Sequence, residues 1–535
     1  MDFADLDVGP PPQVALASYR RRRRELARRL GDGNTLVVAT HPTHTYSNDV
    51  DFLFRPHSDF WYLTGLDEPQ AVLVLRGGSG ATSIFVRERR KEAEIWTGRR
   101  LGVERAEETL GIDRALPFGE LSQRLPGILG RDKVHAVSSH EPHVQRRVAK
   151  AAGRRLVAEP VARRPGGPEA KPTRRAKRRV PPPHGRVLLH EMRLVKDAEE
   201  MRMLQKACDL GVAAHLRAAA AIRPGGREHE VEAAFGYHAR HHGSTGNGYP
   251  SICGCGPNAA VLHYVTNRDE LRTGEPFLID AGCEWGYYTS DITRTYPVGG
   301  AFTRVQERLY DLVLAAHKAA MAKVRPGNAF LAPHEAALET LTAGLVDLGY
   351  VEGPYEEALK AKRSASYFMH GTSHWLGLDV HDAGGLTELD GTPRKLREGM
   401  VLTVEPGLYF NPDYAACPKE AEGIGIRIED DVAVVDGGRR NLTRGLPVAS
   451  AAVSALVGNA LRFTNPTHGF SADNFGFGTR GLFATNDGGA TWVEQKVALP
   501  DGVTQEQASY GLPRFFGRRG VLAVGIVQPD QSQPC

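Results

Sequence analysis

The pattern of hydrophobic and polar positions predicts an α/β domain in the first part of the chain. Between about Thr35 and Ala158, short apolar runs alternate with charged segments of helical period. The apolar runs, which we expect to be strands, are TLVVAT, AVLVLRG, TSIFVRE and KVHAVSS. Strands and helices that alternate in this way are typical of a layered α/β architecture.

The pattern changes after Leu188, where longer helical segments begin. These segments are KDAEEMRMLQKACDLGVAAHLRAAAAI, REHEVEAAFGYHARHHG and RVQERLYDLVLAAHKAAMAKVRPG. The first has start signals in Lys196-Asp197 and stop signals in Arg223-Pro224-Gly225-Gly226. Runs typical of strands and hairpins surround the three helices, so we expect a second domain of α+β character.

A basic segment separates the two patterned regions. It reads RRPGGPEAKPTRRAKRRVPPPHG, which is dense in Pro, Gly and basic residues and has no apolar pattern for a core. This composition predicts a flexible linker or surface excursion at about 162–185. Basic runs also match nuclear-localisation signals, but too easily to be informative. We therefore expect an N-terminal domain at 1–185 and a second domain at 186–458.

The last part of the chain has a different character. Its TNDGGATW segment resembles the Asp-box of sialidase-like β-propeller repeats. Asp487-Gly488-Gly489 would form a tight turn, with Asp487 structural and Trp492 as a packing anchor. One repeat cannot close a propeller, because blades bury their faces against neighbours. We expect 459–535 to form a short β-rich appendage, such as a partial blade.

Composition and charge limit the partners of the chain. Its 67 Lys and Arg residues against 63 Asp and Glu residues give a net charge of +4, too balanced for general attraction to nucleic acid or an anionic membrane. No apolar run approaches the length of a membrane span, and the start of the chain lacks the order of a secretory signal. The arginine-rich segment YRRRRRELARRL is expected to be a helix with a solvated face.

The six cysteines indicate a reducing compartment, and hence a cytoplasmic protein. They are scattered along the chain and form no CxxC pair. Cys253 and Cys255 lie in the Gly-rich stretch SICGCGPN, where small residues in a turn explain them better than a thiolate site does.

Four short stretches carry the candidate chemistry. They read FLIDAGCEWGYYTSDITRT, HGTSHWLGLDVHD, LTVEPGLYF and GIRIEDD, and their candidate metal ligands are Asp280, Asp291, His374, Glu405 and Glu429. Four carboxylates and one imidazole suit two hard or borderline divalent cations. Two such cations held close together can activate water and polarise a carbonyl, so the set predicts a metal-dependent hydrolase.

Each stretch alone has a simpler interpretation. FLID, CEWGYYT and SDITRTYPV form a hairpin pattern, in which Asp280 and Asp291 could be turn formers. The histidines could be ordinary hydrogen-bonded residues, and Arg427 with Glu429 a surface ion pair on one strand face. That all of these alternatives hold together is much less plausible than one metal site.

The four stretches and their surroundings resemble the bacterial-type Xaa-Pro aminopeptidase (aminopeptidase P) family, which is related to prolidase, creatinase and methionine aminopeptidase. The matching stretches include HSDFWYLTGLDEPQAVLVL, EAEIWTGRRLG, HEMRLVKDAEE, LHYVTN and GIGIRIEDDVAVV, and the resemblance extends to about Gly458. It implies an α/β N-terminal domain followed by an α+β catalytic domain of the pita-bread fold.

The resemblance also implies roles for individual residues. Asp280 would bind one metal, Asp291 and Glu429 would bridge both, and His374 and Glu405 would complete the second. Glu405 would also take a proton from the attacking water. The substrate-binding pocket would contain His263 and His381, which stabilise the oxyanion, and also His370 and Arg427, with Arg427 orienting a carboxylate.

The activity implied is removal of an N-terminal residue that precedes proline, with Mn²⁺ as the favoured metal. The Xaa-Pro bond has no N–H, so metal-activated water and His donors avoid a contact that other proteases need. Prolidase, restricted to dipeptides, is the nearest alternative; a non-catalytic peptide-binding module on the same fold is opposed by the intact ligands. The resemblance further implies a homo-oligomer, a dimer or tetramer, in which Trp96 could reach a neighbouring subunit.

Overall fold

The computed structural model describes residues 14–137, 142–159, 183–413 and 417–457, together with short strands between Ala460 and Ile526. The chain forms two compact units. One comprises Pro12–Leu194 with Leu389–Thr392, and the other comprises Val195–Glu388 and the residues from Pro393 onward. The basic linker, Asp487 and Trp492 lie outside the described residues.

The N-terminal unit is built on a six-stranded sheet in the order β6-β5-β4-β1-β7-β8. Its strands are β1 (Asn34–Ala39), β4 (Val72–Arg76), β5 (Thr82–Val86), β6 (Arg114–Pro117), β7 (Lys133–Val137) and β8 (Leu156–Val157). The pairs β1–β4 and β4–β5 are antiparallel, whereas β1–β7, β5–β6 and β7–β8 are parallel. All four predicted strand runs are therefore confirmed.

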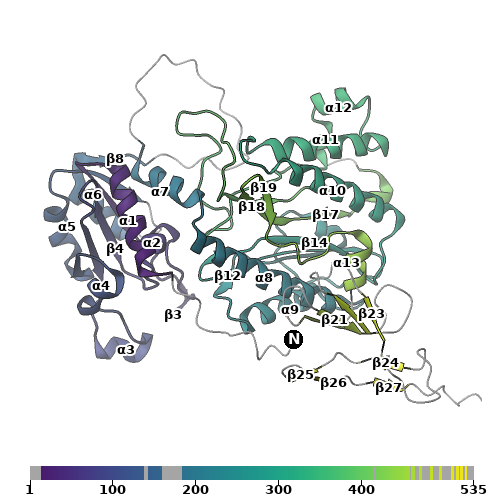
Figure 1. Cartoon of the computed structure of the whole chain (residues 1–535), viewed down its shortest axis with the longest axis horizontal. Coiled ribbons are helices and arrows are strands. Elements are labelled where there is room, and N and C mark those ends of the chain that lie inside the picture. Colours follow the sequence, from purple (N-terminus) through teal and green to yellow (C-terminus); the bar gives the residue numbers. More distant parts are fainter. Residues whose placement is uncertain are drawn as a thin grey trace, which may run out of the picture. The chain divides into compact units, whose positions relative to one another are not determined.

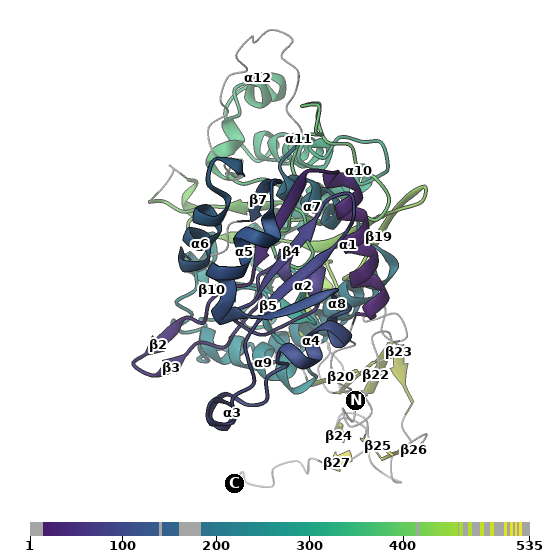
Figure 2. The same ribbon diagram turned by 90° about the vertical axis from the view of Figure 1, so that its left-hand side faces the viewer.

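Helices cover both faces of this sheet, with α5 and α6 on one side and α1 on the other (Figures 1 and 2). The helices are α1 (Leu16–Leu30), α2 (Ser58–Thr64), α3 (Lys91–Thr97), α4 (Val103–Leu110), α5 (Leu121–Leu129), α6 (Pro142–Ala152) and α7 (Gly185–Leu194). Leu121, Leu125 and Leu129 of α5 share a core cluster with Val37 and Val72 of the sheet. A hairpin of β2 (Thr45–Ser47) and β3 (Val50–Asp51) completes the unit.

The arginine-rich segment forms the expected helix with a solvated face. This helix is α1, and its opposite face includes two arginines, Arg22 and Arg23, that are buried. The Arg23 guanidinium donates to the carbonyls of Leu63 and Gly111, both at 2.7 Å. These carbonyls lie at the C-terminal ends of α2 and α4, where backbone oxygens lack partners within the helix. The two arginines therefore tie helix ends together, a role that composition does not reveal.

The second unit places small antiparallel sheets between pairs of helices. The helices are α8 (Ala198–Ala221), α9 (Glu228–His241), α10 (Arg304–Lys323), α11 (Ala332–Asp347), α12 (Tyr355–Lys360) and α13 (Ser450–Leu456). In Figure 1, strands β14 and β17 lie between α10 and α11 on one side and α8 and α9 on the other. The predicted start of α8 is confirmed by a capping box between Asp197 and Glu200.

Four small sheets lie around the candidate ligands: Asp280 is on a strand, and Asp291, Glu405 and Glu429 are each directly next to a strand end. The strand orders of these sheets are β10-β11-β14, β13-β12-β9, β15-β18-β19 and β16-β17. The strands are β9 (Gly246–Asn247), β10 (Ile252–Cys255), β11 (Pro276–Ala281), β12 (Cys283–Trp285), β13 (Tyr288–Thr289), β14 (Ile292–Pro297), β15 (Val401–Val404), β16 (Gly407–Tyr409), β17 (Gly425–Arg427), β18 (Asp430–Val435) and β19 (Gly438–Asn441).

The predicted hairpin is present but contains a second one. Strands β11 and β14 pair, yet the connection between them forms β12 and β13, which join β9 in another sheet. The turn between them has positive φ at both central residues, Gly286 (56°) and Tyr287 (69°), as a two-residue type I′ turn requires. This inner hairpin sets the spacing between the two acids.

The C-terminal segment contains β-structure, in agreement with the expected β-rich appendage. Strands β20 (Ala460–Phe463), β21 (Gly469–Ala472), β22 (Leu482–Thr485) and β23 (Val493–Gln495) form a four-stranded antiparallel sheet in chain order. Two further strand pairs follow, β24 (Ala508–Tyr510) with β27 (Val524–Ile526) and β25 (Arg514–Phe516) with β26 (Arg519–Val521). Within the described residues, no helix is both long and apolar enough to cross a membrane.

Candidate metal centre

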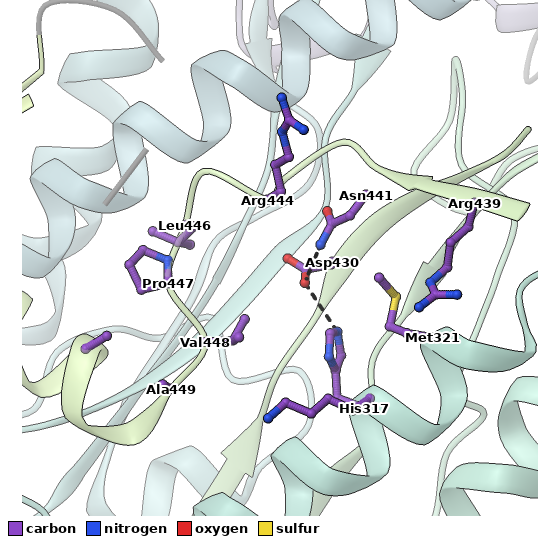
Figure 3. Close-up of a pocket in the computed structure, with 12 residues that line it drawn as sticks. His317, Met321, Asp430, Arg439, Asn441, Arg444, Leu446, Pro447, Val448 and Ala449 are labelled. Atoms are coloured by element: carbon purple, nitrogen blue, oxygen red, sulfur yellow. Dashed lines mark hydrogen bonds and ion pairs between the residues drawn. The ribbon is translucent and has the colours of Figure 1, made fainter. Parts of the chain in front are cut away.

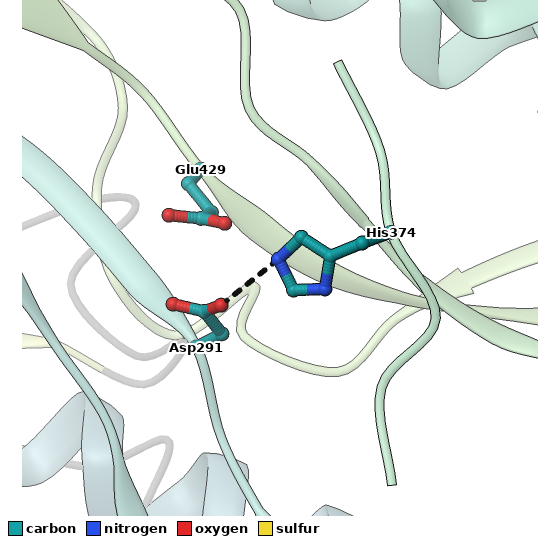
Figure 4. A group of neighbouring side chains, drawn as sticks. All are labelled: Asp291, His374 and Glu429. Atoms are coloured by element: carbon teal, nitrogen blue, oxygen red, sulfur yellow. Dashed lines mark ion pairs between the residues drawn. The ribbon is translucent and has the colours of Figure 1, made fainter. Parts of the chain in front are cut away.

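Three of the expected ligands, Asp291, His374 and Glu429, lie close together in the structure. One ligand atom from each of Asp291, His374 and Glu429 lies within 4.8 Å of the others. Figure 4 shows the two carboxylates and the imidazole pointing into a shared space from separate segments. The closest pair is His374 Nε2 and Asp291 Oδ2, at 3.2 Å. The three residues are thus arranged to hold one cation between them.

Asp280 joins this group through the sheet. It lies on β11 opposite Thr293 of β14, so it is adjacent to the start of the strand that follows Asp291. The hydroxyl of Tyr249 lies 2.5 Å from Oδ1 of both Asp280 and Asp291. Because a phenol carries one proton, it can donate to only one of these carboxylates at a time. The carboxylates of Asp280 and Asp291 therefore both lie next to the same Tyr249 hydroxyl.

Glu429 is held by Thr293 of the neighbouring strand. The Thr293 hydroxyl donates to Glu429 Oε2 at 2.6 Å, and the Glu429 N–H donates to the Thr293 carbonyl at 3.1 Å. The chain passes from β17 to β18 at this point, so Glu429 lies where two sheets meet β14. This bridge brings Glu429 to Asp291 although they are far apart in sequence.

Glu405 and His374 come from neighbouring extended segments. The Glu405 N–H donates to the Thr372 carbonyl, and the Thr403 N–H donates to the His374 carbonyl. Glu405 Oε1 lies 3.6 Å from His374 Nε2. His374 Nδ1 lies 3.1 Å from the Trp375 carbonyl, which leaves Nε2 facing the carboxylates. An N–H at Nδ1 bonded in this way is the arrangement that metal-binding histidines use.

The electrostatics of the cluster fit a positively charged group. Burial and the charges of the neighbouring acids raise the pKa of Glu429 well above its usual range. Burial, with the charge of Asp291 adding to it, raises the pKa of Glu405 to about 7. Burial alone would lower the pKa of His374, but the hydrogen bond to Asp291 and the charge of Glu405 raise it to about 9. Carboxylates crowded in this way need protons or cations to stay together, and this oxygen-rich donor set suits divalent cations.

The remaining histidines lie around the same space. His370 Nε2 is 2.8 Å from the Tyr409 hydroxyl, and its Nδ1 is 3.6 Å from Glu405 Oε2. The His381 ring centroid lies 4.3 Å from that of His374. Burial, followed by the neighbouring imidazoles of His374 and His263, lowers the pKa of His381 to about 4. His263 is exposed and lies near enough to act on His381 electrostatically.

Arg427 is buried, and its hydrogen bonds go to groups around the ligands. Its Nη2 donates to Asp280 Oδ2 at 2.5 Å, and its Nη1 donates to the Tyr409 hydroxyl at 2.7 Å. Its Nε donates to Thr293 Oγ1 at 3.2 Å. Arg427 therefore orients Asp280 directly and Glu429 through Thr293.

Three residues around the ligands escaped the sequence interpretation. Tyr249 precedes a proline in an irregular segment, so no pattern pointed to it. Thr293 was visible only as a β-branched strand residue. Asp431, which accepts the N–H of Asp291 at 2.9 Å, stands inside the IEDD motif and could have been considered with Glu429.

Comparisons with known proteins agree with this geometry. The profile "Metallopeptidase family M24" matches residues 202–436, and "Aminopeptidase P, N-terminal domain" matches residues 19–137. A Xaa-Pro aminopeptidase of Escherichia coli is 39% identical over 449 residues, which cover 83% of this chain and 98% of that protein.

Solved structures extend the agreement to three dimensions. "Proline aminopeptidase P II from Yersinia pestis" has a TM-score of 0.75 and 37% identity over 83% of this chain and 99% of its own. "Zn substituted E. coli Aminopeptidase P in complex with product" has a TM-score of 0.75 and 36% identity, covering 83% of this chain and 98% of its own. The chain belongs to the Xaa-Pro aminopeptidases, metallopeptidases of family M24 that carry the aminopeptidase P N-terminal domain.

Proposed function

We propose that the chain hydrolyses the peptide bond between an N-terminal residue and a following proline, using two divalent cations. The observation that carries this proposal is the convergence of Asp291, His374 and Glu429 within 4.8 Å. Asp280 and Glu405, each adjacent to a member of that group, would complete the ligand set. Asp291 and Glu429 are the proposed bridges.

Mn²⁺ is the metal we propose. Hard carboxylate oxygens dominate the donor set, and no thiolate belongs to it. Zn²⁺, Co²⁺ and Fe²⁺ accept the same ligand types, so metal-reconstituted enzyme should be compared with each of them. The highest turnover with Zn²⁺ would contradict the assignment of Mn²⁺.

When bound, such a cation pair supplies an activated water and polarises the scissile carbonyl. Glu405 is the proposed acceptor of the water proton, because it lies 3.6 Å from His374 Nε2, beside the group formed by His374, Asp291 and Glu429. His381 stays uncharged near neutral pH, since its pKa is lowered to about 4. With His263, it would donate a ring N–H to the oxyanion, whereas His370 lines the pocket. Arg427 orients Asp280 rather than touching substrate in this scheme.

The substrates we propose are peptides with proline at the second position. The related proteins are named Xaa-Pro aminopeptidases, which supports this class. The experiment that tests it offers the manganese-loaded enzyme Xaa-Pro dipeptides, longer Xaa-Pro peptides and matched Xaa-Ala peptides. Cleavage of both Xaa-Pro sets and not of the Xaa-Ala set is expected. Cleavage of dipeptides alone would favour a prolidase instead.

We also propose a homo-oligomer, a dimer or tetramer, that forms through the N-terminal unit. Trp96 and Ile95 on α3 are 87% and 81% exposed, which is unusual for large apolar side chains. Sedimentation should give a mass above one chain, and Trp96→Ala should lower either association or activity. A fully active monomer would contradict shared sites.

We also propose that the protein resides in a reducing compartment such as the cytoplasm. Cys208, Cys253, Cys255 and Cys283 are buried free thiols, and Cys417 is free as well. Burial raises the pKa of Cys253 well above its usual range, which argues against a thiolate role for the CxC pair.

A further inference from the structure

A second pocket is lined by residues of β18, the strand that begins directly after Glu429, and of neighbouring segments. Its volume is about 390 Å³, and Figure 3 shows its lining residues on α10, β18, β19 and the segment that follows them. Asp430 forms part of this lining. Successive side chains of an extended strand point to opposite faces, so Asp430 faces away from the metal centre that Glu429 faces. The pocket is therefore separate from the candidate active site.

The acidic residue in the lining, Asp430, has its negative charge balanced by neighbouring hydrogen-bond donors. Asp430 accepts from Arg294 Nη2 at 2.7 Å, from Thr443 Oγ1 at 2.8 Å and from Asn441 Nδ2 at 2.9 Å. His317 Nε2 lies 3.3 Å from Asp430 Oδ2 (Figure 3). Since these partners already balance the carboxylate, Asp430 contributes no attraction for a further cation.

The rim of the pocket is cationic. Lys318, Arg439 and Arg444 line it and are exposed. Among the described residues, neither Lys318 nor Arg439 forms an ion pair, and Arg444 acts on Asp209. Met321, Leu446 and Pro447 are apolar members of the same lining. A lining that combines three cations with apolar side chains favours a ligand with an anionic end and an apolar body.

We infer that this pocket binds a small organic anion, a carboxylate or a phosphate with an apolar portion, and that its occupancy is transmitted to Glu429. The volume lies within the range of small-molecule sites. Lys318 on α10 and Arg439 on β19 both line the pocket, so an anion bound there can accept a charge-assisted hydrogen bond from either side chain.

Arg294 provides the connection to the metal centre. Its Nη2 bonds Asp430 on the pocket side, and its Nη1 donates to the Glu429 carbonyl at 2.6 Å. Both side chains are almost fully buried. A ligand that shifts Asp430 or Asn441 would therefore move the backbone of Glu429, because they share one hydrogen-bond network.

Direct titration of the metal-loaded enzyme tests the binding. The probes are phenyl phosphate and benzoate, with benzyl alcohol as the neutral analogue. The variant Lys318→Gln with Arg439→Gln removes the two unpaired cations, and Arg440→Gln is the matched control on the same strand but outside the lining. The double variant should bind the anions at least about tenfold more weakly, since the loss of even one charge-assisted hydrogen bond costs about 1.5 kcal/mol or more.

The headgroup and the rival site are distinguished in the same experiment. The tighter of phenyl phosphate and benzoate identifies a phosphate or a carboxylate as the natural headgroup. Equal binding by wild type, the double variant and Arg440→Gln would place the anion elsewhere, such as on the metals, and would overturn the inference. Failure of either anion to bind saturably would do the same.

Turnover of a Xaa-Pro peptide tests the transmission. The turnover experiment rests on the proposed function, whereas the binding titration does not. The bound anion should change kcat without competing with the peptide, in wild type and Arg440→Gln but not in the double variant. Binding without any change in kcat would overturn the link to Glu429, and purely competitive inhibition would locate the anion in the active site.

Discussion

The carboxylate of Asp431 accepts the backbone N–H of Asp291 at 2.9 Å. Asp431 itself is buried and also accepts from Cys208 Sγ at 3.3 Å. It therefore sets the position of the main chain at one of the proposed bridging ligands without pointing at the metals. Groups of this kind, which orient ligands from behind, commonly matter almost as much as the ligands.

We therefore predict that Asp431→Ala weakens metal binding by about 10- to 100-fold, because the Asp291 N–H loses its acceptor. Asp431→Asn keeps an oxygen acceptor and should lose less. Titration of metal-free protein with Mn²⁺ measures the effect. The control is Asp436→Ala, an exposed acid just after the same strand. Equal affinity in Asp431→Ala and the control would contradict the positioning role.

The proposed bridging ligands should be the most sensitive positions. Asp291→Asn or Glu429→Gln should lower metal-dependent turnover by more than about a hundredfold, because each removes a contact to both cations. Glu398→Gln, a change at an exposed acid away from the centre, is the matched control. Exhaustive chelation should abolish activity and Mn²⁺ should restore it. Full activity in protein shown by elemental analysis to lack metal would end this proposal.

The histidines should separate into two groups. His381→Ala and His263→Ala should lower kcat by about a hundredfold or more at normal metal content, because they remove donors to the transition state. His374→Ala should lose metal instead. His229→Ala, at an exposed histidine of α9, serves as control. If all three site variants lost metal alike, the assigned roles would be wrong.

The stability of the metal-free protein should fall as pH rises from 6.5 to 9. The folded-state pKa of His374 is raised from 6.5 to about 9, so its stabilising contribution is complete below 6.5 and is lost as pH rises through 9. The raised pKa of Glu429 acts with the same sign. The lowered pKa values of His370, about 3, and His381, about 4, act only below 6.5, where they oppose this trend.

Bound metal should reverse this dependence. Cations replace the protons of the cluster, so metal affinity rises with pH. The difference in melting temperature between Mn²⁺-loaded and chelated protein should therefore be larger at pH 9 than at pH 6.5. A constant difference would show that the acids and His374 do not exchange protons for metal.

The C-terminal appendage should be dispensable for catalysis. Every proposed ligand precedes Asp430, and the described part of the appendage consists of short strands. We predict that truncation after Gly458 leaves metal binding and Xaa-Pro cleavage largely unchanged. We also predict that limited proteolysis cuts first within 459–535 or in the basic linker near Arg174.

The appendage contacts the rest of its unit, so the truncation can also affect stability. Strand β20 lies beside α8, and Leu482 and Phe483 of β22 are buried. A clear drop in melting temperature or aggregation of the truncated chain would mean that the appendage is an integral part of this unit.

Residue types and their order in the sequence determined the chemistry of this protein. The strand runs of the N-terminal unit and the bounds of α8 could be read from local patterns, because propensity, capping and period are local properties. The five candidate ligands were inferred from the residue types of four stretches taken together. The alternation in IRIEDD placed Arg427 and Glu429 on one face, and both do contact Thr293. The family resemblance supplied the roles that these patterns left open.

Only the tertiary structure decided which groups meet. Thr293 and Glu429 are 136 residues apart, and their pairing depends on β14 lying beside the β17–β18 crossing. The contacts of Tyr249 and Asp431 with the ligands could be recognised only in the folded structure, because no local sequence pattern indicates them. Arg22 and Arg23 lie on the buried face of α1, and the carbonyls that they contact come from helices 40 or more residues away. Such contacts depend on long-range packing, which no short window of sequence contains.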